Sequence, residues 1–94
     1  MNIKKGDYIS ADIGEGLPWV RYESDGDVEN YYRDVYDEKT GVLVYSDGEL
    51  LKVEEVDKEK GKVALYNENI GNERSSIFEI SMEQFQTDFK KALR

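Results

Sequence analysis

The chain has 94 residues, a formal net charge of −8 and neither cysteine nor histidine. The absence of these two residue types excludes disulfides, thiol nucleophiles, zinc fingers and His-dependent catalytic triads. The excess of acid also argues against direct binding of nucleic acid, because phosphate contacts require clustered lysine and arginine.

Large apolar residues are frequent enough to predict a folded chain despite its charge. Ile, Leu, Val and Phe account for 23 of the 94 residues, which is above the roughly 20% typical of highly charged disordered chains. We expect one domain over residues 1–94. No apolar run is long enough to span a membrane, and none follows Lys4 and Lys5 as it would in a signal peptide. We therefore expect a cytoplasmic protein without a membrane partner, located in the host cell cytoplasm if it is phage-encoded.

The first two predicted strands are short. Tyr8 to Ile13 alternates polar and apolar residues after the turn Lys5-Gly6-Asp7, and Trp19 to Tyr22 follows a proline. Gly14-Glu15-Gly16 separates the two strands. We interpret these glycines as a turn, because no lysine lies beside them and Glu15 would repel a phosphate.

The next segment has the spacing of an amphipathic helix. Its apolar residues follow the i, i+3, i+4, i+7, i+8 pattern, at Val28, Tyr31, Tyr32, Val35 and Tyr36. Asp27 is placed to cap the start of this helix and Gly41 to end it. A strand is the alternative, since Tyr and Val favour strands, but it would put Asn30 and Asp34 on the same face as Val28, Tyr32 and Tyr36. We predict a helix.

The middle of the chain is typical of β-hairpins. Val42 to Tyr45 and Leu50 to Val56 flank an Asp-Gly turn, which predicts a hairpin. The alternation within the second of these strands slips at Glu54 and Glu55, which indicates a bulge. Two further strands are predicted, at Lys62 to Tyr66 and Ser76 to Ile80.

The C-terminal segment predicts a second helix. Ser81 followed three residues later by Gln84 is a capping-box signature. An apolar helical face then follows, formed by Met82, Phe85, Phe89, Ala92 and Leu93.

These elements predict an α+β fold. Its sheet is small and mostly antiparallel, with five or six strands curled into a partial barrel or sandwich. One acidic helix is inserted in it and one helix closes the C-terminus. The Lys5-Gly6-Asp7 turn entering a first strand that is followed by hairpins resembles, at the level of fold, the start of SH3-like barrels.

The acidic charge is concentrated in one segment. Between Glu23 and Glu38 there are seven acids and one arginine, a local charge of −6. Acids spaced along a helix approximate the row of phosphates on a duplex, and tyrosines beside them supply interface anchors. The plainer interpretation is a solvated face. The predicted partner-binding residues are Glu23, Asp25, Asp27, Glu29, Tyr31, Tyr32, Asp34, Tyr36, Asp37 and Glu38.

The same acidic and aromatic residues allow other interpretations. Asp25, Asp27 and Glu29 suit a weak Ca²⁺ or Mg²⁺ site, but their spacing does not fit an EF-hand loop, and a turn followed by an N-cap explains them. Trp19 and the tyrosines suit a small pocket, although core packing is the default for such residues. No pair of carboxylates is diagnostic of acid–base chemistry, so we expect no catalytic residue, no metal and no cofactor.

The resulting hypothesis is a non-enzymatic acidic domain that binds a basic protein partner. Its most specific form is a phage- or mobile-element-type inhibitor that mimics nucleic acid and blocks a nucleic-acid-binding enzyme or repressor. The alternative is a small structural or regulatory accessory domain that binds a protein partner, or itself, through its sheet and its Tyr/Trp surface. We assign no oligomeric state.

Overall fold

The structure is a computed structural model that describes residues 3–14, 16–24, 31–68, 77–90 and 92, with the backbone alone for residues 22–24, 31 and 32. These residues form seven strands in two antiparallel sheets and one short helix, so the fold is mixed α+β and mostly sheet, as predicted. The expectation of one sheet with five or six strands is not met, because the strands divide into sheets of four and three. The elements are β1 (Tyr8–Ser10), β2 (Val20–Ser24), β3 (Tyr31–Tyr36), β4 (Leu43–Ser46), β5 (Leu50–Asp57), β6 (Lys62–Tyr66), β7 (Ile77–Ser81) and α1 (Met82–Asp88).

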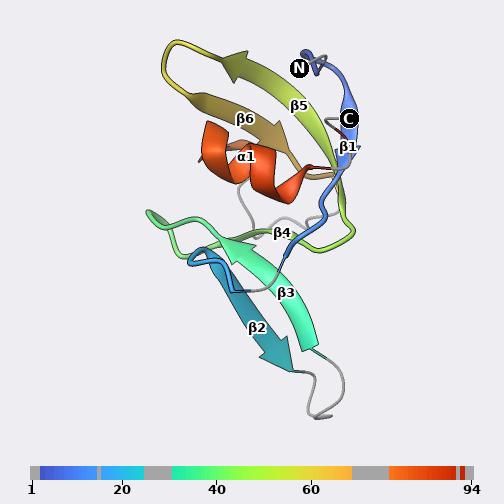
Figure 1. The fold of residues 1–94 in the computed structure, drawn as a ribbon, viewed down its shortest axis with the longest axis vertical. Helices are drawn as coiled ribbons and strands as arrows, with labels where there is room; N and C mark the ends of the chain where they lie inside the picture. The colour runs from blue at the N-terminus through green and yellow to red at the C-terminus, as the bar shows by residue number, and fades with distance from the viewer. Residues whose placement is uncertain (1–2, 15, 25–30, 69–76, 91, 93–94) are drawn as a thin grey trace.

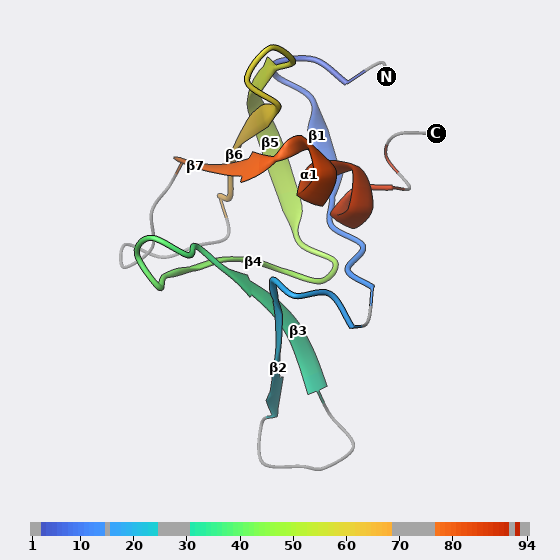
Figure 2. The ribbon, with the colours of Figure 1, turned by 60° about the vertical axis from the view of Figure 1, so that its left-hand side comes forward.

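The four-stranded sheet supports the helix. Its strand order is β1-β5-β6-β7, and β7 leads directly into α1, which lies against one face of the sheet (Figures 1 and 2). The predicted bulge is confirmed, because the register between β5 and β6 shifts between Val53 and Glu55. The bulge lets the strand bend where its alternation of polar and apolar residues slips.

The three-stranded sheet has the order β2-β3-β4. β2 and β3 form a hairpin that projects from the rest of the molecule (Figures 1 and 2). β4 pairs with β3 only at Asp34, Val35 and Tyr36, the end nearest the body. Among the described residues, the outer half of the hairpin is therefore only two strands wide.

The predicted helix, which runs from Val28 towards Gly41, is wrong where the structure describes it, because residues 31–36 are strand β3 and residues 38–40 form a turn. This strand pairs with β2 from Val20↔Val35 to Ser24↔Tyr31. Tyr and Val side chains fit a pleated sheet better than a helix. The polar Asp34, which argued against a strand, is accommodated because its carboxylate accepts a 2.6 Å hydrogen bond from the Ser46 hydroxyl of β4.

The strands on either side of Asp47-Gly48 are present, but the predicted hairpin between them is wrong. β5 already has β1 on one edge and β6 on the other, so no edge is left for β4, which pairs with β3 instead. The turn is a corner between the two sheets. Gly48 donates to the Ala11 carbonyl at 2.9 Å and adopts φ of 84°, a conformation that favours glycine.

The C-terminal helix begins as predicted and ends earlier. The Ser81 hydroxyl caps it by accepting a 3.0 Å hydrogen bond from the Gln84 amide. The helix ends at Asp88, with Phe89 as its C-cap. Phe85 and Phe89 are buried and Ala92 packs against the same core, whereas Leu93 lies outside the described residues.

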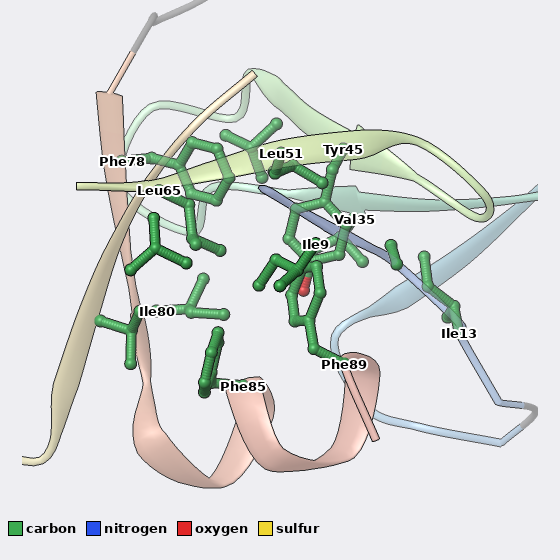
Figure 3. Close-up of a cluster of buried hydrophobic side chains, with 14 residues drawn as sticks. Ile9, Ile13, Val35, Tyr45, Leu51, Leu65, Phe78, Ile80, Phe85 and Phe89 are labelled. Atoms are coloured by element: carbon green, nitrogen blue, oxygen red, sulfur yellow. The ribbon is translucent and has the colours of Figure 1, made fainter. Parts of the chain in front are cut away.

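The hydrophobic core draws residues from both sheets and the helix. Phe85 and Phe89 point from α1 towards strand residues such as Leu65 of β6 and Tyr45 of β4 (Figure 3). The Tyr45 ring stacks on Phe78 of β7 with their centroids 5.7 Å apart. Burial of this surface is the main force holding the sheets together. Within the described ranges, no helix has the length and apolar character needed to cross a membrane.

Candidate functional site

The structure distributes the predicted binding residues over two ends of one hairpin. Glu23 pairs in register with Tyr32, towards the outer end of the hairpin, and Tyr31 opens β3 there. Asp25, Asp27 and Glu29, which also form the alternative Ca²⁺ or Mg²⁺ site, lie outside the described residues. Tyr36, Asp37 and Glu38 lie at the other end, after a strand of six residues, which spans about 20 Å. The ten residues therefore do not form one face of a helix.

Asp34 is the predicted residue that the fold itself uses. Its side chain is 7% exposed and accepts the hydrogen bond from Ser46 that fixes β3 against β4. A carboxylate that is buried in this way stabilises the sheet and presents little surface to a partner.

The turn between β3 and β4 is fixed by Asp37. Its side chain accepts a 2.8 Å hydrogen bond from the Lys39 amide, and its backbone N–H donates to the Val42 carbonyl at 2.8 Å. Gly41 donates to the Asp37 carbonyl and adopts φ of 70°. Asp37 is therefore engaged within the turn, while the neighbouring Glu38 is exposed.

A groove of about 370 Å³ lies where this turn faces β7 and the start of α1. Three predicted residues line it, namely Tyr36, Asp37 and Glu38. The groove adds residues that the sequence analysis did not assign to the site, and those used below are Trp19, Phe78, Glu79, Glu83 and Gln84. Its volume lies within the range of small-ligand sites.

Beneath the groove, the side chains of Trp19 and Tyr45 converge on Asp88, and Gln84 joins this network through Tyr45. Trp19 Nε1 donates a 2.9 Å hydrogen bond to Asp88 Oδ2, and the Tyr45 hydroxyl donates to the same oxygen at 2.5 Å. Gln84 Nε2 donates to the Tyr45 hydroxyl at 2.9 Å. The predicted capping box is thus half formed, because the Gln84 side chain bonds Tyr45 in the core and not the Ser81 amide. This network fixes the Trp19 ring in the groove wall.

Asp88 is a buried acid that forms no ion pair with another described residue. Its side chain is fully buried, and its Oδ1 atom has no hydrogen-bond partner among the described residues. Burial raises the pKa of Asp88 above its ordinary value, and the nearby Asp47 carboxylate adds to this, while the bonds from Tyr45 and Trp19 act in the opposite direction. Burial, together with Asp88, likewise raises the pKa of the Tyr45 hydroxyl, which remains a donor at neutral pH.

The position of Asp88 in the sequence could have indicated a buried acid. Asp88 lies three residues after Phe85, so it falls on the apolar face of the terminal helix, where a carboxylate is exceptional. Trp19 was noted only as a core or pocket residue. No sequence pattern places Glu79, Glu83 and Gln84 at the groove, because their position opposite the β3–β4 turn depends on how the two sheets pack.

The described side chains do not form a metal centre, since no group of three or more Asp, Glu, His or Cys residues among them is placed to hold an ion. Comparison of the chain with protein-family models, with curated proteins and with solved structures finds no match. The argument for function therefore rests on the charge and geometry of the chain.

Proposed function

We propose that this chain is a non-enzymatic acidic domain that binds a basic protein partner through residues 23–38. The observation that carries the proposal is the position of the charge. Residues 23–38 hold a net charge of −6 out of −8 for the chain. The described part of this segment, residues 23–24 and 31–38, belongs to the projecting β2–β3 hairpin and to the turn that follows it (Figure 2). A projecting acidic element attracts a basic surface at long range and docks with little steric hindrance.

The most specific form of the proposal is a phage- or mobile-element-type inhibitor. A basic channel that accepts the phosphates of a duplex also accepts closely spaced carboxylates. The protein would then compete with nucleic acid for a nucleic-acid-binding enzyme or repressor. Competition by duplex DNA for the captured partner tests this form separately from partner binding itself.

The test is capture of partners from a cell lysate with three proteins. These are the wild type, a variant substituted in the sequence between β2 and β3 and called the hairpin variant (Asp25→Asn, Asp27→Asn, Glu29→Gln), and a control variant (Glu54→Gln, Glu55→Gln, Glu59→Gln) with the same change in net charge. We expect a basic protein that the wild type and the control retain at low salt and that the hairpin variant loses. Equal capture by all three proteins would contradict the proposal.

A specific observation favours the alternative of an accessory domain. One row of the four-stranded sheet carries Tyr8, Lys52, Tyr66 and Ile77 in register, on the face opposite the core. Tyr8 and Ile77 are 51% and 56% exposed. Exposed apolar side chains on one sheet face support docking of a protein partner or a second copy there. A captured partner that stays bound at high salt would favour this function over the acidic one.

A further inference from the structure

The groove between the β3–β4 turn and α1 has an aromatic wall. Trp19 and Tyr36 are half-buried and line it, together with the buried Phe78. The groove lies between elements of both sheets, so its shape depends on the packing of the whole molecule and is held by the Trp19–Asp88 bond. Aromatic faces carry negative electrostatic potential and attract cations.

The polar groups that face the groove are mainly acceptors. Trp19 uses its only N–H on Asp88, and the Gln84 amide group donates to Tyr45, so both point their donors inward. Glu38, Glu79 and Glu83 remain around the groove, and none of them forms an ion pair with another described residue. Lys39 and Lys62 also line the groove, but they are exposed, and neither forms an ion pair with these carboxylates. An occupant that donates hydrogen bonds and carries positive charge complements this lining.

The spacing of the carboxylates suits an extended cation better than a metal ion. No three acidic side chains within the described ranges approach closely enough to hold a metal. A guanidinium is planar, stacks on aromatic rings and offers five N–H donors in different directions. The chain already contains a contact of this kind with one residue of the wall, because the guanidinium carbon of Arg21 lies 4.4 Å from the centroid of the Tyr36 ring. Arg21 itself does not line the groove.

We propose that this groove binds an arginine side chain presented by the basic partner. The inference rests on the proposed function, and it names the chemistry that the partner brings to the β3–β4 end of the acidic segment. The arginine stacks against Trp19 and donates hydrogen bonds to the surrounding carboxylates, while the hairpin supplies long-range attraction.

The test uses a blocked Gly-Arg-Gly peptide as the probe. Trp19 is the only tryptophan in the chain, so its indole N–H gives a single, assignable signal in a ¹⁵N-correlated NMR spectrum. We expect the Arg peptide to shift this signal saturably, with the millimolar affinity of a single side chain. The matching citrulline peptide, which has the same shape without the charge, should bind about tenfold more weakly.

Two variants assign the effect to the groove. Glu38→Gln, Glu79→Gln and Glu83→Gln together should weaken the Arg peptide about tenfold, while the Glu54, Glu55 and Glu59 control should bind it as the wild type does. The position of the Trp19 signal without peptide verifies that each variant is folded. The absence of a saturable shift, equal binding of the citrulline peptide, or equal weakening by the control would each overturn the inference. If the Arg peptide does not bind but a partner is still captured by the wild type and lost by the hairpin variant, the Arg-binding inference is refuted and the proposed function stands.

Discussion

The Tyr45 hydroxyl donates a 2.5 Å hydrogen bond to the Asp88 carboxylate, and this bond joins strand β4 of one sheet to the helix that packs on the other. Both residues are fully buried. Trp19 adds a bond to the same carboxylate from the segment before β2. One buried acid therefore connects three parts of the chain that meet below the groove.

Replacement of Tyr45 by Phe should destabilise the protein by about 1–3 kcal/mol, because Asp88 loses a donor and Gln84 loses its acceptor while the ring packing is kept. Urea unfolding measures the change. Tyr66→Phe is the matched control, since the half-buried Tyr66 hydroxyl has no hydrogen bond to another described residue. An equally large loss of unfolding free energy in Tyr66→Phe would show that the Tyr45 hydrogen bonds do not stabilise the protein specifically.

The stability of the protein should depend on the protonation of Asp88. Because the pKa of Asp88 is raised above its ordinary value of 3.8, the folded state binds the proton more tightly than the unfolded state. The contribution of protonated Asp88 to the free energy of unfolding is complete below pH 3.8 and is lost as the pH rises through the pKa of Asp88 in the folded state. Asp88→Asn lacks it, so the stability advantage of the wild type over Asp88→Asn should shrink as the pH rises.

Thermal or urea unfolding of both proteins across the acidic range measures this trend. Glu59→Gln, in the exposed β5–β6 turn, is the control and should show no such trend against the wild type. A difference between the wild type and Asp88→Asn that grows with pH would contradict the assignment.

The corner between the sheets should require glycine at position 48. Gly48 has φ of 84°, so Gly48→Ala should cost about 1–2 kcal/mol of unfolding free energy. Gly14 has no positive φ, and a Cβ there would meet only Leu17 Cδ1 at 3.9 Å. Gly14→Ala should therefore be neutral or slightly stabilising. Equal effects of the two substitutions on denaturant unfolding would argue against the strained corner.

Charge reversal should affect stability differently at the buried Asp34 of β3 and at the exposed Glu38 of the following turn. Asp34→Lys should destabilise the fold by more than about 2 kcal/mol, because it places an amine where Ser46 donates to a buried carboxylate. Glu38→Lys should change stability by less than about 0.5 kcal/mol and still weaken binding of the Arg peptide. Circular dichroism melts of both variants test the difference, and similar melting temperatures would contradict it.

Local patterns in the sequence predicted most of the strands but not their partners. The strand predicted at Lys62–Tyr66 has the observed bounds, and the bulge at Glu54 and Glu55 and the Ser81 cap are confirmed, because each depends on neighbours along the chain. The helix predicted from Val28 towards Gly41 is wrong because aromatic residues at helical spacing also fit a strand once β2 lies beside them. The Asp47-Gly48 hairpin failed because competition for the edges of β5 is a property of the whole sheet.

The candidate site was predictable only in part, for the same reason. The acidic segment is visible in the sequence, and Tyr36, Asp37 and Glu38 do line the groove. Glu79 and Glu83 reach it from β7 and α1 through tertiary packing alone. The burial of Asp34 follows from its pairing with Ser46, which no periodicity in β3 reveals.

The most direct test of the central claim is the salt dependence of affinity for the captured partner. The dissociation constant is measured at low and high ionic strength for the wild type, the hairpin variant and the equal-charge control. We predict that affinity of the wild type and the control falls steeply with salt, and that the hairpin variant binds weakly with a shallower dependence. The same affinity and the same salt dependence for all three proteins would contradict an acidic interface at residues 23–38.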